Sequence, residues 1–375
     1  MIKDFHEQPF SEATKLKLDI FRRYIREWVS VFLTESPKLR NVFSVNIFDF
    51  FAGPGRDAEG NDGSPAIIAK ELKSFCDIKA GLKAQKPINL FFNDIDNDKI
   101  CQLKTFLKQI ACKRDCCRAN YSSWPFSEAL DQRYSIIHDK GSANLVILDQ
   151  FGISDVTPDA VKKLAACAQT DILFFIPSSY LHRFQKHPAF VRKFDLRGQN
   201  LDYNTIHRFI CDYFKEKLGN VQYYLAPFSI KTGRNIHGII FGSGNLLGLE
   251  KFLRICWDMD AQTGEANFNI DSDLSRDGQQ CLIPEMNTFR KIDQFEKDLK
   301  GYIQQSNPDN KAMYQFCLEK GFPPKESKKV LDNLQETRWL SVVSILAGEI
   351  VRKGAFYLNS KEIPRIRFQK VEGAS

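Results

Sequence analysis

The repeated pairing of an apolar strand with a helix limits the folds open to this sequence more than any other feature. Apolar runs predict strands at Val45–Phe51, Ile88–Asn93, Leu145–Asp149 and Asp171–Ile176, with a shorter candidate in the stretch CCRANY. Capped or amphipathic segments predict helices at Ala66–Leu72, Asn97–Lys108, Thr157–Ala168, Leu201–Leu218 and Leu247–Trp257. Strands that are apolar throughout and alternate with helices indicate a parallel sheet covered on both faces.

A predicted antiparallel pair of strands, Gln222–Lys231 and His237–Ser243, ends this series. Roughly five parallel strands with such a hairpin form the Rossmann-like α/β sheet of class I methyltransferases. Residues 11–35 precede the series, and their apolar residues at helical spacing predict a long amphipathic helix packed on an edge of the sheet. We expect this first domain to span residues 1–260.

The rest of the chain has a different character. Residues 261–290 are polar and lack a clear periodicity, so residues 261–300 are predicted to be a linker or an excursion. In residues 301–375, two short helices split by Gly-Phe-Pro-Pro and two strand-like segments resemble a winged helix. Lys325, Lys328 and Lys329 lie at the start of the second helix and are candidate nucleic-acid contacts. The alternative is a dimerisation module.

The composition is that of an ordinary globular protein with a mild excess of positive charge. Hydrophobic residues make up 43% of the 375 residues, and the net charge of +7 is compatible with nucleic acid. Because no stretch approaches the roughly 20 apolar residues that span a bilayer, and the N-terminus lacks a signal-peptide core, a cytoplasmic protein is expected. No CxxC pair occurs, so the cluster around Cys112, Cys116 and Cys117 is not expected to bind metal.

The segment FDFFAGPG is the sharpest indication of a ligand. Asp49, Phe51, Gly53 and Gly55 are candidate cofactor-binding residues, because doubly wound sheets bind ligands where a strand ends in a glycine turn. The third glycine of a dinucleotide fingerprint and the Gly-Lys-Ser/Thr of a P-loop are both absent. A cofactor without phosphate, S-adenosylmethionine, is therefore predicted, and the alternative is a tight turn that binds nothing. The polar insertion at residues 56–63 is expected to form a lid or wall.

Acidic residues follow two further strands at the same predicted edge. Asp94 and Asp96 follow Ile88–Asn93, where a carboxylate would hold a ribose, although either could instead cap a helix. Asp149 and Phe151 are candidate catalytic residues, because amino-methyltransferases place an Asp or Asn and an aromatic residue here to hold the acceptor amine and stack on a flipped base.

The sequence departs from the amino-methyltransferase pattern after Leu145–Asp149, and a further loop carries candidate substrate contacts. Gln150 and Phe151 stand where such enzymes usually have prolines, and Asp149 could simply cap its loop. Ser178, Ser179 and Arg183 follow the next strand and are candidate substrate contacts, unless they only satisfy their own loop backbone.

The chain resembles the three-Cys-motif partner proteins, known as TcmP, over nearly its whole length. The resemblance rests on the segments FDFFAGPGR, DGSPAIIAKEL, FFNDID, LVILDQFGI, DILFFIPSSYLHRF, FGSGNLLGLEKFLRICWDMD and MYQFCLEKGFPPKESKKVLDNL. It implies a methyltransferase-like domain with a winged-helix-like tail, a prokaryotic cytoplasm, and a radical-enzyme-like protein with a three-cysteine motif as partner. Two hypotheses follow: a methyltransferase acting on nucleic acid, and a non-catalytic subunit that binds cofactor and nucleic acid for that partner.

Overall fold

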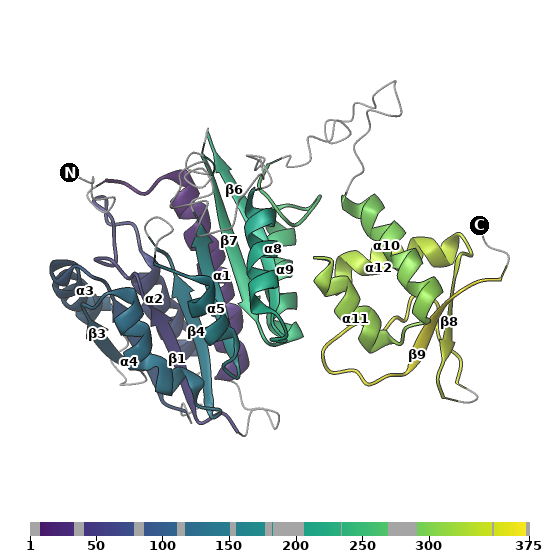
Figure 1. The fold of residues 1–375 in the computed structure, drawn as a ribbon, viewed down its shortest axis with the longest axis horizontal. Helices are drawn as coiled ribbons and strands as arrows, with labels where there is room; N and C mark the ends of the chain where they lie inside the picture. The colour runs from purple at the N-terminus through teal and green to yellow at the C-terminus, as the bar shows by residue number, and fades with distance from the viewer. Residues whose placement is uncertain are drawn as a thin grey trace. The chain divides into compact units, whose positions relative to one another are not determined.

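A seven-stranded mixed sheet forms the centre of the first of two units, Met1–Gly248 and Leu249–Ser375 (Figure 1). The computed structural model describes residues 8–33, 41–78, 86–110, 117–150, 155–176, 182, 206–233, 235–268, 291–346 and 349–372. The strands of the sheet are β1 (Ser44–Asp49), β2 (Ile88–Asn93), β3 (Cys117–Ser122), β4 (Ser142–Leu148), β5 (Thr170–Ile176), β6 (Tyr224–Thr232) and β7 (Asn235–Ser243).

The strand order is β3-β2-β1-β4-β5-β7-β6. β1 to β5 pair in parallel, and β7 runs antiparallel to both β5 and β6. This order confirms the class I methyltransferase sheet, and β6 with β7 is the predicted hairpin. Because β2 and β4 lie on opposite sides of β1, the winding reverses at β1, which is where open α/β sheets form their ligand crevice.

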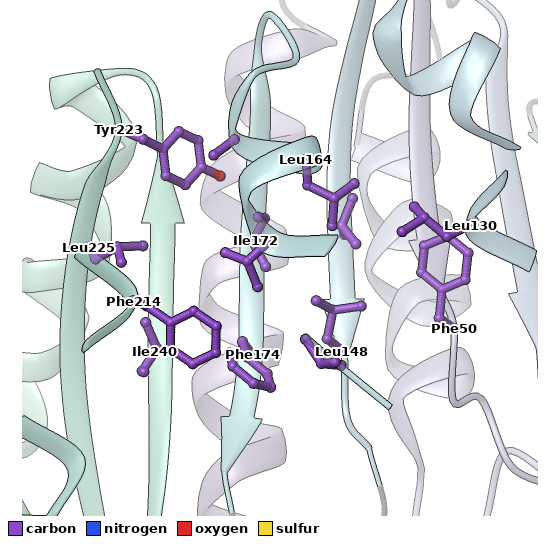
Figure 2. Packing of buried hydrophobic residues seen from close by; sticks show 14 of the residues in the cluster. Phe50, Leu130, Leu148, Leu164, Ile172, Phe174, Phe214, Tyr223, Leu225 and Ile240 are labelled. Carbon is purple, nitrogen blue, oxygen red and sulfur yellow. The ribbon is translucent and has the colours of Figure 1, made fainter. Parts of the chain in front are cut away.

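Helices cover both faces of the sheet (Figure 1). α1 (Glu12–Phe32), α2 (Ser64–Ile78) and α3 (Asn97–Ile110) lie on one face, and α4 (Phe126–His138), α5 (Pro158–Ala165) and α8 (Ile206–Leu218) lie on the other. Side chains from the second group meet those of the strands in a continuous apolar cluster, where the ring of Phe214 lies beside that of Phe174 (Figure 2). The sequence analysis did not predict α4, although its buried residues Phe126, Ala129, Leu130 and Ile137 recur at helical spacing.

The first helix was expected on an edge of the sheet, and this expectation was wrong. α1 lies against a face, because its side chains reach three different strands of the sheet. Lys17 pairs with Asp149 at the end of β4, and the Tyr24 hydroxyl donates to Asp171 Oδ2 at 2.6 Å on β5. The Tyr24 ring also packs on Phe241 of β7, with ring centroids 4.7 Å apart.

A ladder of asparagines, of which Asn46 and Asn144 are buried, fixes the register of the central strands. Asn89 Nδ2 donates to Asn46 Oδ1 at 2.9 Å, and Asn46 Nδ2 donates to Asn144 Oδ1 at 3.0 Å, across the registered pairs of β2, β1 and β4. Asn144 Nδ2 in turn donates to the Ile137 carbonyl and to Thr170 Oγ1. A shift of one residue would break the whole ladder, so these amides select one pairing.

The second unit has its own apolar core. α9 (Leu246–Met259) begins just before the unit and is followed by α10 (Lys291–Ser306), α11 (Asn310–Glu319), α12 (Pro324–Glu336), β8 (Leu340–Ser344) and β9 (Ile366–Lys370). Phe295 stacks on Phe322 with centroids 3.8 Å apart, and Asn310 Oδ1 accepts the Arg365 N–H at 2.8 Å to tie α11 to the segment before β9. The linker predicted to reach residue 300 is wrong over its last part, because residues 291–300 are helical.

Within the described residues, no helix combines the length and the apolar character needed to cross a membrane.

Candidate functional site

Two glycines in the left-handed region build the turn after β1. Gly53 has a φ of 58° and Gly55 a φ of 86°, which side-chain-bearing residues rarely adopt. The Gly53 N–H donates to Asp94 Oδ2 at 2.9 Å, and the Gly63 N–H donates to the Gly55 carbonyl oxygen at 2.8 Å. The turn is therefore held both by the end of β2 and by the start of α2.

Asp49, the last residue of β1, is a fully buried carboxylate. Its Oδ1 accepts the Phe51 N–H at 3.3 Å, whereas its Oδ2 has no hydrogen-bond partner in the described part of the chain. Burial raises the pKa of Asp49 to about 7 against the opposing hydroxyl of Ser64, and the Asp149 and Asp94 carboxylates add to the rise. Because buried polar atoms without a partner are rare, Asp49 Oδ2 is a candidate acceptor for a hydrogen bond from a ligand or a water molecule.

The two acids after β2 have different surroundings. Asp94 is half-buried. Its Oδ2 accepts the Gly53 N–H of the turn, and its Oδ1 accepts the Asp96 N–H at 3.0 Å. Asp96 is exposed, and its Oδ1 accepts the Asp98 N–H at 2.9 Å at the start of α3. Asp96 therefore acts as a helix cap. The oxygens of Asp94 keep further lone pairs for a ligand beside the turn.

The polar insertion at residues 56–63 folds around the buried Asp57. Asp57 Oδ1 accepts the N–H groups of Glu59 and Asn61, and Oδ2 accepts the Phe10 N–H at 2.7 Å. The loop is thus braced from within and fastened to the chain before α1. Its role as a lid or wall stays a prediction.

Asp149, which follows the end of β4, forms an ion pair with Lys17 of α1. Lys17 Nζ lies 2.5 Å from Asp149 Oδ2 and 4.4 Å from the centroid of the Phe175 ring, and Lys17 is only 6% exposed. The carboxylate predicted to hold an acceptor amine therefore holds an amine of the chain itself. Gln150 is also buried, and its Oε1 accepts the Val156 N–H at 3.0 Å, so its side chain serves the local fold.

His237 of β7 lies at the same edge of the sheet. Its ring stacks on Phe175, with centroids 5.4 Å apart and planes inclined by 24°, and its Nδ1 is buried without a partner among the described residues. Burial lowers the pKa of His237, the Lys17 cation lowers it further, and Asp149 opposes both. The imidazole is therefore neutral at pH 7.

The described structure brings the residues predicted from β1, β2 and β4 to one edge. Phe51 lies beside them, with its ring centroid 5.3 Å from that of Phe126. The other predicted residues of this edge, Phe151, Ser178, Ser179 and Arg183, lie outside the described residues, as do Cys112 and Cys116.

The three predicted lysines of the second unit lie on α12, and all are exposed. Lys328 pairs with Asp332 at 3.0 Å, and Lys329 pairs with Glu326. Lys325 forms no ion pair with any described residue. Lys328 also donates to the Gly354 carbonyl at 2.8 Å, so it is tied to the segment before β9, whereas the ion pair of Lys329 is local to the helix.

Comparisons with known proteins give only distant likenesses. No protein-family model matches this chain, and no curated protein matches it significantly in sequence. Its fold is similar to that of Trm1 from Pyrococcus horikoshii, determined with S-adenosyl-L-methionine, at 10% identity and a TM-score of 0.39. That match covers 68% of this chain and 61% of the Trm1 chain, less than two thirds of it.

Two further structures show similar values. A putative O-methyltransferase from Klebsiella pneumoniae matches at 11% identity and a TM-score of 0.32, over 62% of this chain and 90% of that one. TYW2 from P. horikoshii, in complex with MeSAdo, matches at 11% identity and a TM-score of 0.28, over 64% and 66%. None of these likenesses assigns a function to this chain.

Sequence patterns missed Lys17, Phe175 and His237. One signal was present, because Lys17 stands four residues before Phe21 on the apolar stripe of its helix, where a cation is out of place. There was no comparable signal for Phe175 and His237, because each is an ordinary strand residue until the pairing of β5 with β7 is known.

Proposed function

We propose that this chain is an S-adenosylmethionine-dependent methyltransferase that acts on nucleic acid. The observation that carries the proposal is Asp49 Oδ2, a fully buried acceptor without a partner among the described residues, at the switch point of the sheet. A fold that needed Asp49 only for itself would pair this oxygen.

The surrounding residues fit the cofactor. Gly53 and Gly55 present bare backbone beside Asp49, and Asp94 stands at the end of the next strand, where its carboxylate would accept hydrogen bonds from the ribose hydroxyls. When bound, S-adenosylmethionine supplies a methyl group on a sulfonium centre. The residues of the chain then have mainly to bind and align the acceptor, which needs positioning more than a strong acid or base.

The second unit supports a nucleic-acid substrate. Three helices followed by two antiparallel strands have the element order of a winged helix, and the exposed lysines of α12 lie where such a domain contacts a polynucleotide. The net charge of +7 favours a polyanion.

A second candidate function is a non-catalytic subunit that binds cofactor and nucleic acid for a three-cysteine radical-type enzyme, as in the TcmP proteins that the chain resembles. The ion pair between Lys17 and Asp149 favours this candidate, because it occupies the carboxylate expected to hold the acceptor.

Calorimetric titration with S-adenosylmethionine tests the cofactor site. Wild-type protein should bind, and Gly53→Arg should not, because a side chain at this φ strains the turn and fills the space beside Asp49. Gly244→Ala is the matched control, since its added methyl would meet only the Tyr223 ring at 3.8 Å. Absence of binding by the wild type would overturn both candidate functions.

Transfer of a labelled methyl group separates the two functions. Wild-type protein is incubated with labelled S-adenosylmethionine and either total RNA or genomic DNA. We expect label in one of them. Binding of the cofactor without transfer to either nucleic acid would favour the non-catalytic subunit.

Anisotropy measurements with labelled RNA and DNA test the second unit. Lys325→Gln and Lys329→Gln should each weaken binding. Each should also reduce the slope of the logarithm of the binding constant against the logarithm of the salt concentration by about one. Lys311→Gln on α11 is the control, because this residue is exposed but lies on a different helix. Equal losses for all three variants would show a diffuse electrostatic effect and contradict a role for α12.

A further inference from the structure

One cluster of side chains has no role yet in the proposed function. It consists of the polar residues Lys17, Asp149 and His237 and the ring of Phe175, which contacts both Lys17 and His237. We propose that His237 takes the proton that the methyl acceptor loses, and that Lys17 is a positioning residue that holds Asp149 beside it. The acceptor is then a group whose nucleophilic nitrogen or oxygen carries a hydrogen. This inference rests on the proposed methyltransferase function.

The topology places His237 at the correct edge. Gly238 pairs with Ile176, the last residue of β5, so His237 lies level with the carboxyl end of that strand. Asp49 ends β1 and Asp149 follows β4, so the three side chains come from the same edge of the sheet. Ligands of doubly wound sheets bind at this edge.

The face of the sheet also agrees. Phe175 pairs with Ile239, and side chains alternate along a strand, so Phe175, Ile239 and His237 share one face. Lys17 lies over the Phe175 ring on that face and reaches Asp149. The ring is therefore in contact with both the ammonium group and the imidazole.

Stability alone does not account for the cluster. A buried ion pair contributes little net stability, because the cost of removing two charges from water offsets their attraction. His237 Nδ1 is buried without a partner among the described residues, which is a cost to the fold. An unpaired buried atom and a buried charge pair of little net stabilising value lie together at the edge where such sheets bind ligands, which indicates a chemical task.

The chemistry balances with His237 as base. Methyl transfer forms a bond from the acceptor nitrogen or oxygen to carbon and leaves the carbon–sulfur bonding pair on sulfur. The acceptor then releases one proton, which the lone pair of the neutral imidazole accepts to give imidazolium. Asp149 stabilises that cation, and Lys17 keeps the imidazole neutral beforehand because its charge opposes protonation.

Proton NMR titration tests the cluster without an acceptor. The imidazole signal, assigned by its loss in His237→Gln, should titrate below the ordinary value of 6.5 in the wild type. Lys17→Met should raise the pKa of His237, Asp149→Asn should lower it, and Lys17→Arg should leave it low. A structural role for Lys17 would not move this pKa. A His237 pKa unchanged in Lys17→Met, or unchanged in Asp149→Asn, would overturn the inference.

Methyl transfer to total RNA or genomic DNA completes the test. The wild-type rate should rise with pH through the pKa of His237 and then level off. His237→Gln should lose about 100-fold in rate and lose this pH dependence, with S-adenosylmethionine affinity unchanged. Transfer by His237→Gln at the wild-type rate would overturn this inference alone, whereas failure of the wild type to bind S-adenosylmethionine would overturn the proposed function.

Discussion

Asp49 and Asp171 are two buried carboxylates in the same unit, and they differ in whether both oxygens of the carboxylate have partners among the described residues. Asp171 Oδ2 accepts the Tyr24 hydroxyl at 2.6 Å, and Ser243 also hydrogen-bonds to this carboxylate. Asp49 Oδ2 accepts nothing from the described residues. Burial raises the pKa of both, to about 6 for Asp171 and to about 7 for Asp49.

The positions of the two acids explain the difference. Asp171 stands near the amino end of β5, where α1 crosses the sheet and supplies a donor. Asp49 stands at the carboxyl end of β1, where the chain turns away over glycines; the Phe51 N–H and the Ser64 hydroxyl act on its carboxylate, but Oδ2 stays without a partner among the described residues. At the first end the Tyr24 hydroxyl satisfies the buried carboxylate, whereas at the second end Asp49 Oδ2 has no partner among the described residues.

The largest expected effect concerns the pH dependence of stability. The pKa of Asp49 is about 7 in the folded chain and about 3.8 without burial, so its contribution is fully present below about pH 4 and is lost as pH rises through 7. Asp49→Asn removes this loss and should raise the free energy of unfolding at pH 8 by about 4 kcal/mol. Hydrogen exchange of peptides from β1 and β4 across pH 4 to pH 8 measures it.

Asp171→Asn is the matched control for that experiment. It should flatten only the part of the curve between about pH 4 and pH 6, because the pKa of Asp171 rises less. Equal curves for the wild type and Asp49→Asn would mean that the Asp49 carboxylate finds a partner in the folded chain.

The asparagine ladder provides a purely structural reference. Asn144→Leu has a similar volume but removes the partner of Asn46 Nδ2 and the donor to Thr170 Oγ1. We expect a loss of about 3 kcal/mol in the free energy of unfolding, because buried polar groups are left unpaired. Urea denaturation measures it. Normal affinity for S-adenosylmethionine in the surviving folded protein is expected, and a large loss of affinity would contradict the separation of the two ends.

Much of the fold could be predicted from the sequence, because apolar strands and helix starts are local signals. Ile88–Asn93 matches β2 over its whole length, and the hairpin was placed to within a few residues. The glycine turn after β1 was also predicted, although the strand ends at Asp49, two residues before the predicted end at Phe51. These features depend on residues that are neighbours in the chain.

The cluster around Asp149 could not be predicted, because it depends on contacts between distant residues. Lys17 and Asp149 are 132 positions apart, and no local pattern links a lysine on α1 with an acid after β4. His237 becomes significant only when β7 pairs with β5. The helical residues 291–300 were also missed, since the polar stretch before them hides the apolar positions Phe295 and Leu299.

Tyr24→Phe tests the carboxylate of Asp171, which has a hydrogen-bond donor in the folded chain. It removes the hydroxyl that donates to Asp171 and leaves the carboxylate with fewer partners. We expect a loss of about 2 kcal/mol in the free energy of unfolding above pH 7, where Asp171 is ionised, and a smaller loss at pH 5. Urea denaturation at the two pH values measures both. The same loss at the two values would show that the hydroxyl acts by packing alone.

The smallest expected effect concerns ligand affinity and tests Asp49 Oδ2, the oxygen without a partner among the described residues. A ligand group that donates to Asp49 Oδ2 favours the ionised carboxylate, so binding becomes tighter as pH rises toward the Asp49 pKa of about 7. We expect the affinity for S-adenosylhomocysteine to increase about tenfold between pH 5.5 and pH 7.5, with release of a proton detectable by calorimetry in two buffers. Asp49→Asn should abolish this dependence. Asp171→Asn should retain it, because Tyr24 already satisfies that carboxylate and the ligand does not reach it. Loss of the dependence in Asp171→Asn would mean that the two ends of the sheet are coupled, and that the division between polar groups for the fold and polar groups for the ligand is wrong.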